Sequence, residues 1–69
     1  MAEQVYKKVE ITGTSSQGYE AAIKSAVAYA RKKHKDLSWF EVVEQRGNVK
    51  GADIIFQVTL KIGFLAPAD

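Results

Sequence analysis

The last third of the chain holds the feature that most constrains its fold, a long alternation of apolar and polar residues. From residue 54 to residue 64, every second side chain is large and apolar: Ile54, Phe56, Val58, Leu60, Ile62 and Phe64. The positions between them carry Ile55, Gln57, Thr59, Lys61 and Gly63. Successive side chains of a β-strand point to opposite faces, so this period of two predicts a strand with one fully apolar face.

Two more strands are predicted upstream. From Val5 to Thr12, apolar residues alternate with polar ones, which is typical of a half-buried strand. A second alternation runs from Leu37 to about Val49. It places Phe40 and Val42 on one face and four residues on the other: Trp39, Glu41, Val43 and Gln45. The segment 50–53 contains a glycine and predicts the tip of a hairpin that leads into the last strand.

A helix is predicted between the first two strands, because apolar residues recur there at helical spacing: Tyr19, Ala22, Ile23, Ala26, Val27 and Ala30. Residues 13–18 before it are expected to form a turn, and the basic stretch 31–35 should contain its end. Gly18 and Ala21 stand where a capping box would have a hydroxyl and a carboxylate, so that motif is missing. The fold class is therefore α+β, with the order β-α-β-β and a three-stranded antiparallel sheet wrapped around one helix.

The length of 69 residues predicts one small domain spanning residues 1–69, which buries too little surface to be very stable alone. The sequence has no cysteine and one histidine, which excludes disulfides and disfavours a zinc site. Assembly with other chains is the remaining source of stability. The apolar strand faces should clasp the helix, which leaves the second sheet face bare. That face should hold apolar or aromatic side chains among charges and be buried by copies of the same chain: Tyr6, Trp39, Val43, Ile55 and Thr59.

Trp39 is the only tryptophan and lies on the predicted bare face. It is interpreted either as an interface anchor or as a stacking surface for a planar ligand, and both hold if the ligand sits in an oligomer interface. Gln57 should lie on the same face. Its amide offers a donor and an acceptor side by side, which suits the edge of a heterocycle, although a solvated or cross-strand polar residue is the more common case for such a pattern.

Arg46 lies near the hairpin end of its strand, together with Glu44 and Asn48. It is interpreted either as a bidentate phosphate ligand or as the partner of Glu44 or a neighbouring chain in an ion pair. The basic stretch 31–35 is favoured by the helix dipole, so it predicts no nucleic acid partner. An enzyme is not predicted, because His34 has no supporting triad and the odd separation of Glu41 and Glu44 should put them on opposite faces.

No apolar run approaches the roughly 20 residues that span a bilayer, so no membrane partner is expected. The N-terminal segment MAEQVYKK lacks the apolar core of a signal peptide, which predicts a cytoplasmic location.

The three strand motifs "VEITG", "WFEVVEQRG" and "FQVTLKIGF" resemble those of the dodecins across nearly the whole chain. The resemblance implies a small flavin-binding protein that assembles as a hollow spherical homododecamer. In that family the tryptophan matching Trp39 stacks on the isoalloxazine ring, in flavin pairs held between two tryptophans. The glutamine matching Gln57 hydrogen-bonds the pyrimidine edge of the flavin.

The resemblance also implies that Arg46 lies near the ribityl or phosphate end of the ligand, which favours FMN over riboflavin or FAD. Glu44 and Asn48 belong to the same expected ligand region, although Asn48 stands where histidine is common. The implied function is storage of flavin with protection from photochemistry, by electron transfer from Trp39. Coenzyme A is a second ligand that the sequence neither requires nor excludes. A ligand-free structural oligomer and a small basic nucleic-acid-binding module are the alternatives.

Overall fold

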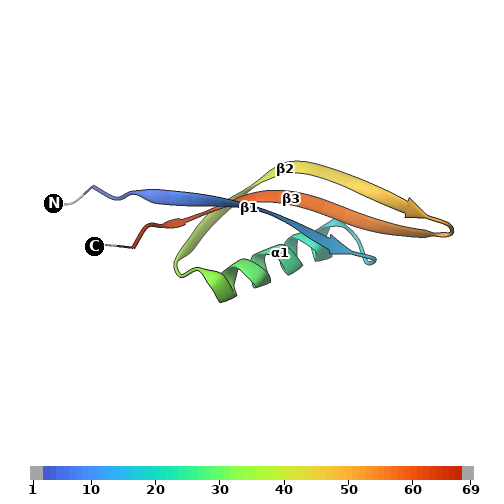
Figure 1. Cartoon of the computed structure of the whole chain (residues 1–69), viewed down its shortest axis with the longest axis horizontal. Helices are drawn as coiled ribbons and strands as arrows, with labels where there is room; N and C mark the ends of the chain where they lie inside the picture. Colours follow the sequence, from blue (N-terminus) through green and yellow to red (C-terminus); the bar gives the residue numbers. More distant parts are fainter. Residues whose placement is uncertain (1–2, 68–69) are drawn as a thin grey trace.

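The structure, a computed structural model, describes residues 3–67 and has the predicted order of elements (Figure 1). Strand β1 spans Tyr6–Ser15, helix α1 spans Tyr19–Lys33, strand β2 spans Leu37–Lys50 and strand β3 spans Asp53–Leu65. The strands form one antiparallel sheet of order β1-β3-β2, which places the apolar-faced β3 in the centre. The prediction of a β-α-β-β fold with a three-stranded antiparallel sheet and one helix is confirmed.

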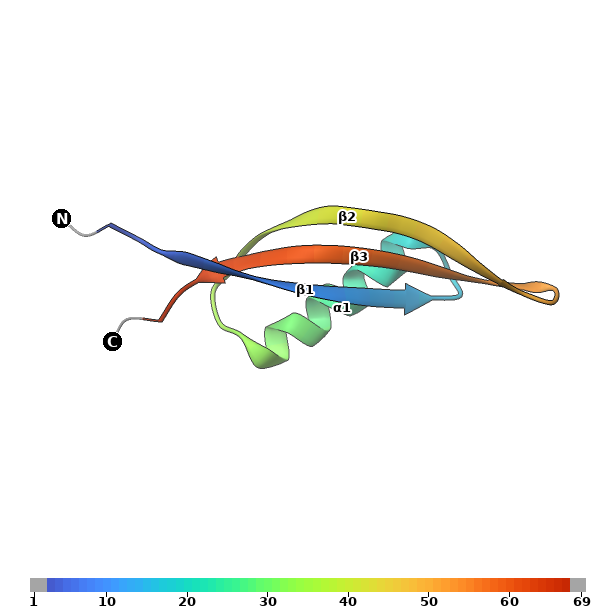
Figure 2. The same ribbon diagram turned by 45° about the horizontal axis from the view of Figure 1, so that its top comes forward.

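Helix α1 lies against one face of the sheet, below β1 and β3 (Figures 1 and 2). The buried core consists of three helix alanines facing three residues of β3, with all six at most 3% exposed: Ala22, Ala26, Ala30, Val58, Leu60 and Ile62. Burying a side chain the size of Leu60 or Ile62 stabilises the fold by about 1.5–3 kcal/mol. The helical stripe predicted from the sequence is therefore the stripe that packs.

Gly13 corrects one prediction. Residues 13–15 continue β1 rather than forming a turn. A Cβ atom at Gly13 would overlap the carbonyl oxygen of Ala22 and would lie 3.0 Å from the Cβ of Ala26. The glycine is thus the point where the helix backbone comes closest to the sheet. Glycine occurs both in turns and where two backbones approach closely, so the sequence alone does not distinguish the two.

Strand β2 corrects a second prediction, because α1 covers β1 and β3 but hardly touches β2. Phe40 and Val42 lie opposite Ile62 and Leu60, on the helix side of the sheet, yet each is 46% exposed. A helix with its side chains is about 10 Å wide and strands lie about 4.8 Å apart, so one helix covers about two strands. Leu37 at the start of β2 packs against the core, but Phe40 and Val42 leave β2 with an uncovered apolar surface on this side as well.

The β2–β3 hairpin extends past the helix and past the end of β1 (Figure 1). Its last paired residues are Lys50 and Asp53, so it closes through a two-residue turn, as predicted. The last residue of β1, Ser15, lies opposite Phe56, and beyond that pair the sheet has only two strands. Val49 is 74% exposed in this two-stranded part.

The helix ends agree with the sequence. At the start, Gly18 makes no side-chain cap, and its carbonyl oxygen accepts from the N–H of Ala22 at 3.1 Å. At the other end, three basic residues occupy the last turn, and the N–H of His34 donates to the Ala30 carbonyl at 2.9 Å. The helix dipole favours cations at that end. Within residues 3–67, no helix has the length and apolar character needed to cross a membrane.

Candidate functional site

Trp39 lies on the sheet face away from α1, which we call the outer face. It pairs with Gly63 of β3, between the positions of the inward-facing Ile62 and Phe64. Its indole centroid is 5.3 Å from the ring centroid of Tyr6 on β1, with the two planes tilted by 58°. Trp39 is 39% exposed and Tyr6 43% exposed. The prediction that Trp39 faces away from its own helix is confirmed.

A β-bulge between Val42 and Glu44 changes the faces of the second half of β2. Val43 is the extra residue, with no Cα partner in β3. After it, Gln45 lies opposite the buried Val58, so Gln45 is on the helix side and its predicted place on the outer face is wrong. A bulge sets two residues of one strand against one of the other, which reverses the alternation beyond it.

The bulge also puts Glu41 and Glu44 on the same face, contrary to the prediction from their odd separation. Glu41 lies opposite Lys61 and Glu44 lies opposite Thr59, and both partners belong to the outer row of β3. The two glutamates occupy successive positions of the outer face, and Glu41 is engaged by Lys8 of β1.

The same shift brings the other predicted residues onto the outer face. Arg46 lies opposite Gln57, and Gln57 in turn lies opposite Thr14 of β1. Asn48 lies opposite Ile55, one outer position nearer the hairpin tip. Four candidates thus gather on the outer face of the β2–β3 hairpin: Glu44, Arg46, Asn48 and Gln57. We call them the hairpin group.

The hairpin group lies far from Trp39. Trp39 is level with Gly63, and Arg46 is level with Gln57, six residues earlier in β3. At about 3.3 Å per residue, this places the two locations about 20 Å apart along the sheet. One copy of the chain therefore does not bring Trp39 and Gln57 to the same small ring system.

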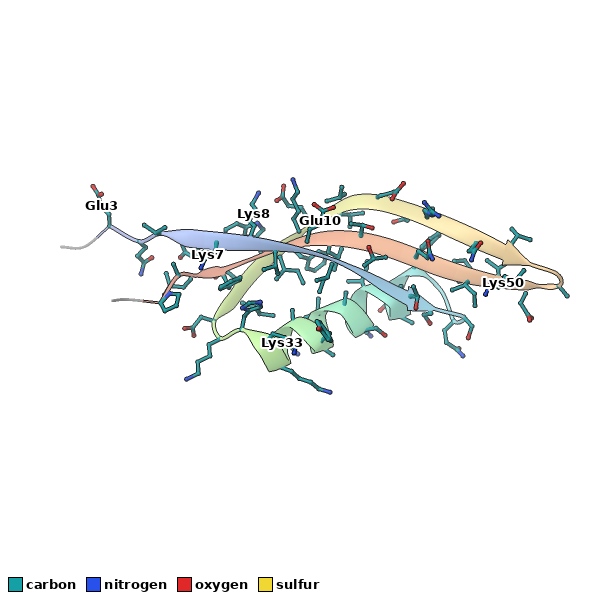
Figure 3. The ribbon with its side chains drawn as sticks, viewed as in Figure 1. Glu3, Lys7, Lys8, Glu10, Lys33 and Lys50 are labelled. Atoms are coloured by element: carbon teal, nitrogen blue, oxygen red, sulfur yellow. The ribbon has the colours of Figure 1, made fainter. Side chains whose placement is uncertain are left out.

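The surroundings of Trp39 are polar on one side. Lys8 Nζ of β1 lies 2.5 Å from a carboxylate oxygen of Glu41, and Lys8 projects from the outer face (Figure 3). The hydrogen bond and the positive charge of Lys8 lower the pKa of the Glu41 carboxyl below its usual value. Desolvation opposes this lowering of the pKa, and the positive charge of Lys61 adds to it more weakly than Lys8 does.

The contacts of Trp39 with Tyr6 and Gly63 were not predicted. The residues come from three strands, and only the strand register brings them together. A glycine paired with the tryptophan in the adjacent strand could have indicated these contacts. That pairing is visible only once the register of β2 and β3, with its shifts, is known.

The basic stretch at the end of α1 has aromatic neighbours in the structure. Lys33 Nζ lies 5.5 Å from the ring centroid of Tyr29, and the His34 ring stacks on Phe64 with centroids 4.2 Å apart and planes at 20°. An open cavity of about 560 Å³ lies beside them, between the start of β1 and the end of β3. None of the predicted site residues lines it. Within residues 3–67, no group of three His, Asp or Glu side chains is arranged to hold a metal ion.

These features define a class of protein: a small β-α-β-β unit that presents a half-exposed tryptophan on an open sheet face. The dodecin family model matches residues 5–66. The chain belongs to the dodecin family, which is a family of small, non-catalytic flavin-binding proteins.

Individual relatives agree with this assignment. The chain is 53% identical to a dodecin of Thermus thermophilus over 62 residues, which covers 88% of this chain and 90% of that one. The crystal structure of the tt0972 protein from T. thermophilus superimposes with a TM-score of 0.91 at 48% identity, covering 97% of this chain and 100% of the other. The dodecin from Streptomyces coelicolor matches with a TM-score of 0.93 at 34% identity, over the whole of both chains.

Proposed function

We propose that this chain stores and buffers FMN, with the isoalloxazine ring stacked on Trp39 at an interface between copies of the chain. The observation that carries the proposal is the half-exposed indole on the outer face of the sheet, the face that α1 does not cover. An indole offers a flat, electron-rich surface, and stacking on it contributes about 0.5–1.5 kcal/mol beyond the area buried. Electron transfer from Trp39 to the excited flavin would shorten the excited state and limit photochemical damage.

The site proposed here is shared between copies. Because Trp39 and Gln57 lie about 20 Å apart in one chain, the copy that stacks the ring is not the copy whose Gln57 hydrogen-bonds its edge. A complete site then contains Trp39 from one protomer and the hairpin group from another. Assembly is part of ligand binding in this arrangement.

Exposed apolar side chains support self-association as a homododecamer. β2 carries them on both sides of the sheet: Phe40 and Val42 on the helix side and Trp39 on the outer side, with the exposed Val43 at the bulge between them and the hairpin group. Large exposed apolar surfaces on a small domain usually mark interaction sites. Two such surfaces on opposite faces of one strand suit a closed assembly with more than one kind of interface.

Arg46 supports FMN over riboflavin. Its guanidinium lies on the outer face beside Gln57, and neither of the two ion pairs among residues 3–67 involves it. A guanidinium binds a phosphate through two parallel hydrogen bonds, which riboflavin does not offer. Glu44 and Asn48 lie on either side of Arg46 along β2 and would contact the polar part of the ligand. FAD and coenzyme A are larger ligands that the same titrations would test.

The remaining parts of the proposal concern the protein as a whole. Residues 1–69 act as one dodecin-like domain in the cytoplasm, and the protein holds its flavin without turning over a substrate. The bound flavin is the cargo, so no catalytic residue is assigned.

The experiment is a titration of the purified protein with FMN, riboflavin and FAD, followed by flavin fluorescence, with the molecular mass measured by light scattering. We expect strong quenching, tightest binding of FMN, and the mass of a dodecamer. A colourless dodecamer that quenches none of the three flavins would identify a structural oligomer instead. Salt-sensitive binding of DNA or RNA that is lost when Lys32 and Lys33 are neutralised would favour the nucleic-acid-binding alternative.

A further inference from the structure

Gly63 is the part of β3 that lies directly beneath the Trp39 ring. It is buried, and a Cβ atom added there would overlap the ring atoms Cε2 and Cζ2 of Trp39 and lie 2.6 Å from Cη2. Real Cβ atoms essentially never come within 3.0 Å of a neighbour. Any side chain at position 63 would therefore displace the indole.

The overlap also shows how the indole lies. The three atoms are consecutive around the six-membered ring, and the added carbon would be close to all of them. An atom approaching the ring edge would be near one of them and distinctly farther from its neighbours. The carbon would thus lie against the ring face, so one face of the indole rests on the Gly63 backbone and the other points away from the sheet.

A neighbouring ring helps to hold the indole in that orientation. Tyr6 contacts it from β1 in a tilted arrangement, which is a favourable geometry for two aromatic rings. Glu41 occupies the next outer position of β2, and its carboxylate is held by Lys8. The indole is therefore oriented before any ligand arrives, and preorganisation lowers the entropic cost of binding.

We propose that Gly63 is a positioning residue of the stacking site, whose bare backbone lets the Trp39 indole lie flat on β3 and offer one open face to one planar heterocycle. This rests on the proposed function, because the heterocycle is taken to be the flavin. The covered face excludes a second ring on the other side. Each Trp39 would then stack on a single flavin, and the position of that flavin above the sheet would be set by the thickness of the indole alone.

The test replaces Gly63 by alanine and compares it with Gly47→Ala, a matched strand glycine whose added Cβ would meet Ile54 Cγ2 at an ordinary 3.6 Å. Gly63→Ala should weaken FMN binding roughly tenfold or more and reduce the quenching of bound flavin. In flavin-free protein, its Trp39 emission should shift to the red and become more accessible to acrylamide. Gly47→Ala should match the wild type in all three measurements.

A double variant shows whether Gly63 acts through the indole. Adding Gly63→Ala to Trp39→Ala should cause no further loss of flavin affinity, because the ring that the methyl group displaces is already absent. If Gly63→Ala alone does not fold, recovery of folding in the double variant would support the overlap, and failure of both would overturn the inference.

Flavin binding and the positioning role of Gly63 are tested by different outcomes. Gly63→Ala protein with wild-type emission, acrylamide accessibility and flavin affinity would overturn the role of Gly63 and leave flavin binding standing. Wild-type protein that binds no flavin would overturn the proposed function. The emission and acrylamide measurements would still report whether the indole rests on Gly63.

Discussion

The two ends of the outer face are built differently. At the Trp39 end, all three strands are present, and the indole is contacted from β1 by Tyr6 and from β3 by Gly63. At the hairpin end, Gln57 lies one pair from the end of β1, and beyond Phe56 only two strands continue, without the helix beneath them. The indole is contacted from both neighbouring strands of its own chain, whereas the hairpin group lies towards the end of the third strand, with Asn48 beyond it.

This difference separates two tasks of a binding site. A stacking surface must be flat and correctly tilted, and the Trp39 end achieves this within one protomer. In the proposed site, hydrogen bonds to the ring edge and phosphate come from the hairpin group. Its members lie towards the end of the third strand, and Asn48 lies beyond it in a two-stranded ribbon. Such ribbons are at best marginally stable in water by themselves. We infer that assembly orders the hairpin end, and that ligand contacts there appear only in the oligomer.

The largest effect is expected from a charge placed on the uncovered helix side of β2. Phe40→Asp should leave the protomer folded, because Phe40 is 46% exposed there and α1 hardly contacts β2. It should break the assembly, because an unpaired charge in an apolar interface costs several kcal/mol. Light scattering should give the mass of a monomer, with loss of flavin quenching. Ser25→Asp, on the exposed side of α1, is the control and should remain assembled.

Removing the indole should produce the next largest effect. Trp39→Ala should lower flavin affinity roughly 10- to 100-fold, the range observed for loss of one aromatic stacking contact, and should restore the fluorescence of the bound flavin. Fluorescence titration measures both, and light scattering confirms that the variant assembles. Unchanged affinity and quenching would show that the flavin binds elsewhere.

Mixing subunits tests whether the two ends of one site come from different copies. Trp39→Ala and Gln57→Ala chains, unfolded together and reassembled, should form some sites with both residues intact and so regain part of the lost affinity. Each variant reassembled alone is the control. No recovery in the mixed assembly would mean that Trp39 and Gln57 of one chain serve the same site, against the separation of about 20 Å.

A smaller and more selective effect is expected at the hairpin end. Arg46→Ala should weaken FMN binding about tenfold or more, because a hydrogen bond to a charged group contributes about 1.5–3 kcal/mol, and should leave riboflavin binding unchanged. Arg31→Ala, in the last turn of α1, is the matched control. Equal losses for FMN and riboflavin would point to a structural role for Arg46 and remove the support for FMN.

Much of this fold follows from the spacing of apolar residues, and the exceptions have identifiable causes. The period of two in β3 and the alanine stripe of α1 predicted the core, because both describe a single continuous apolar face. The bulge at Val43 was not predictable, since two adjacent valines suit either face of a strand. Trp39 and Gln57 were correctly placed on the outer face. Their separation along the sheet was not predicted, because it depends on which residue of β3 pairs with Trp39, and only the strand register shows this.

The smallest effect is expected from the ion pair beside Trp39. Lys8 lowers the pKa of Glu41, so the pair stabilises the folded protein when Glu41 is ionised, above about its ordinary pKa of 4.5. That contribution is lost as the pH falls through the lower pKa of the folded state. Glu41→Gln should therefore be slightly less stable than the wild type at pH 7, and the difference should vanish in acid. Urea unfolding at several pH values measures it.

A double-mutant cycle assigns that effect to the pair. If the pair alone is responsible, Lys8→Met and Glu41→Gln should each reduce stability at pH 7, and the combined variant should be no less stable than either. The pair is exposed, and salt should weaken its contribution. The Trp39 emission should follow the same acid transition, because Glu41 occupies the outer position of β2 next to Trp39. A change in stability without a change in emission would show that the ion pair does not orient the indole. The orientation of the Trp39 indole would then depend on Gly63 and Tyr6 alone.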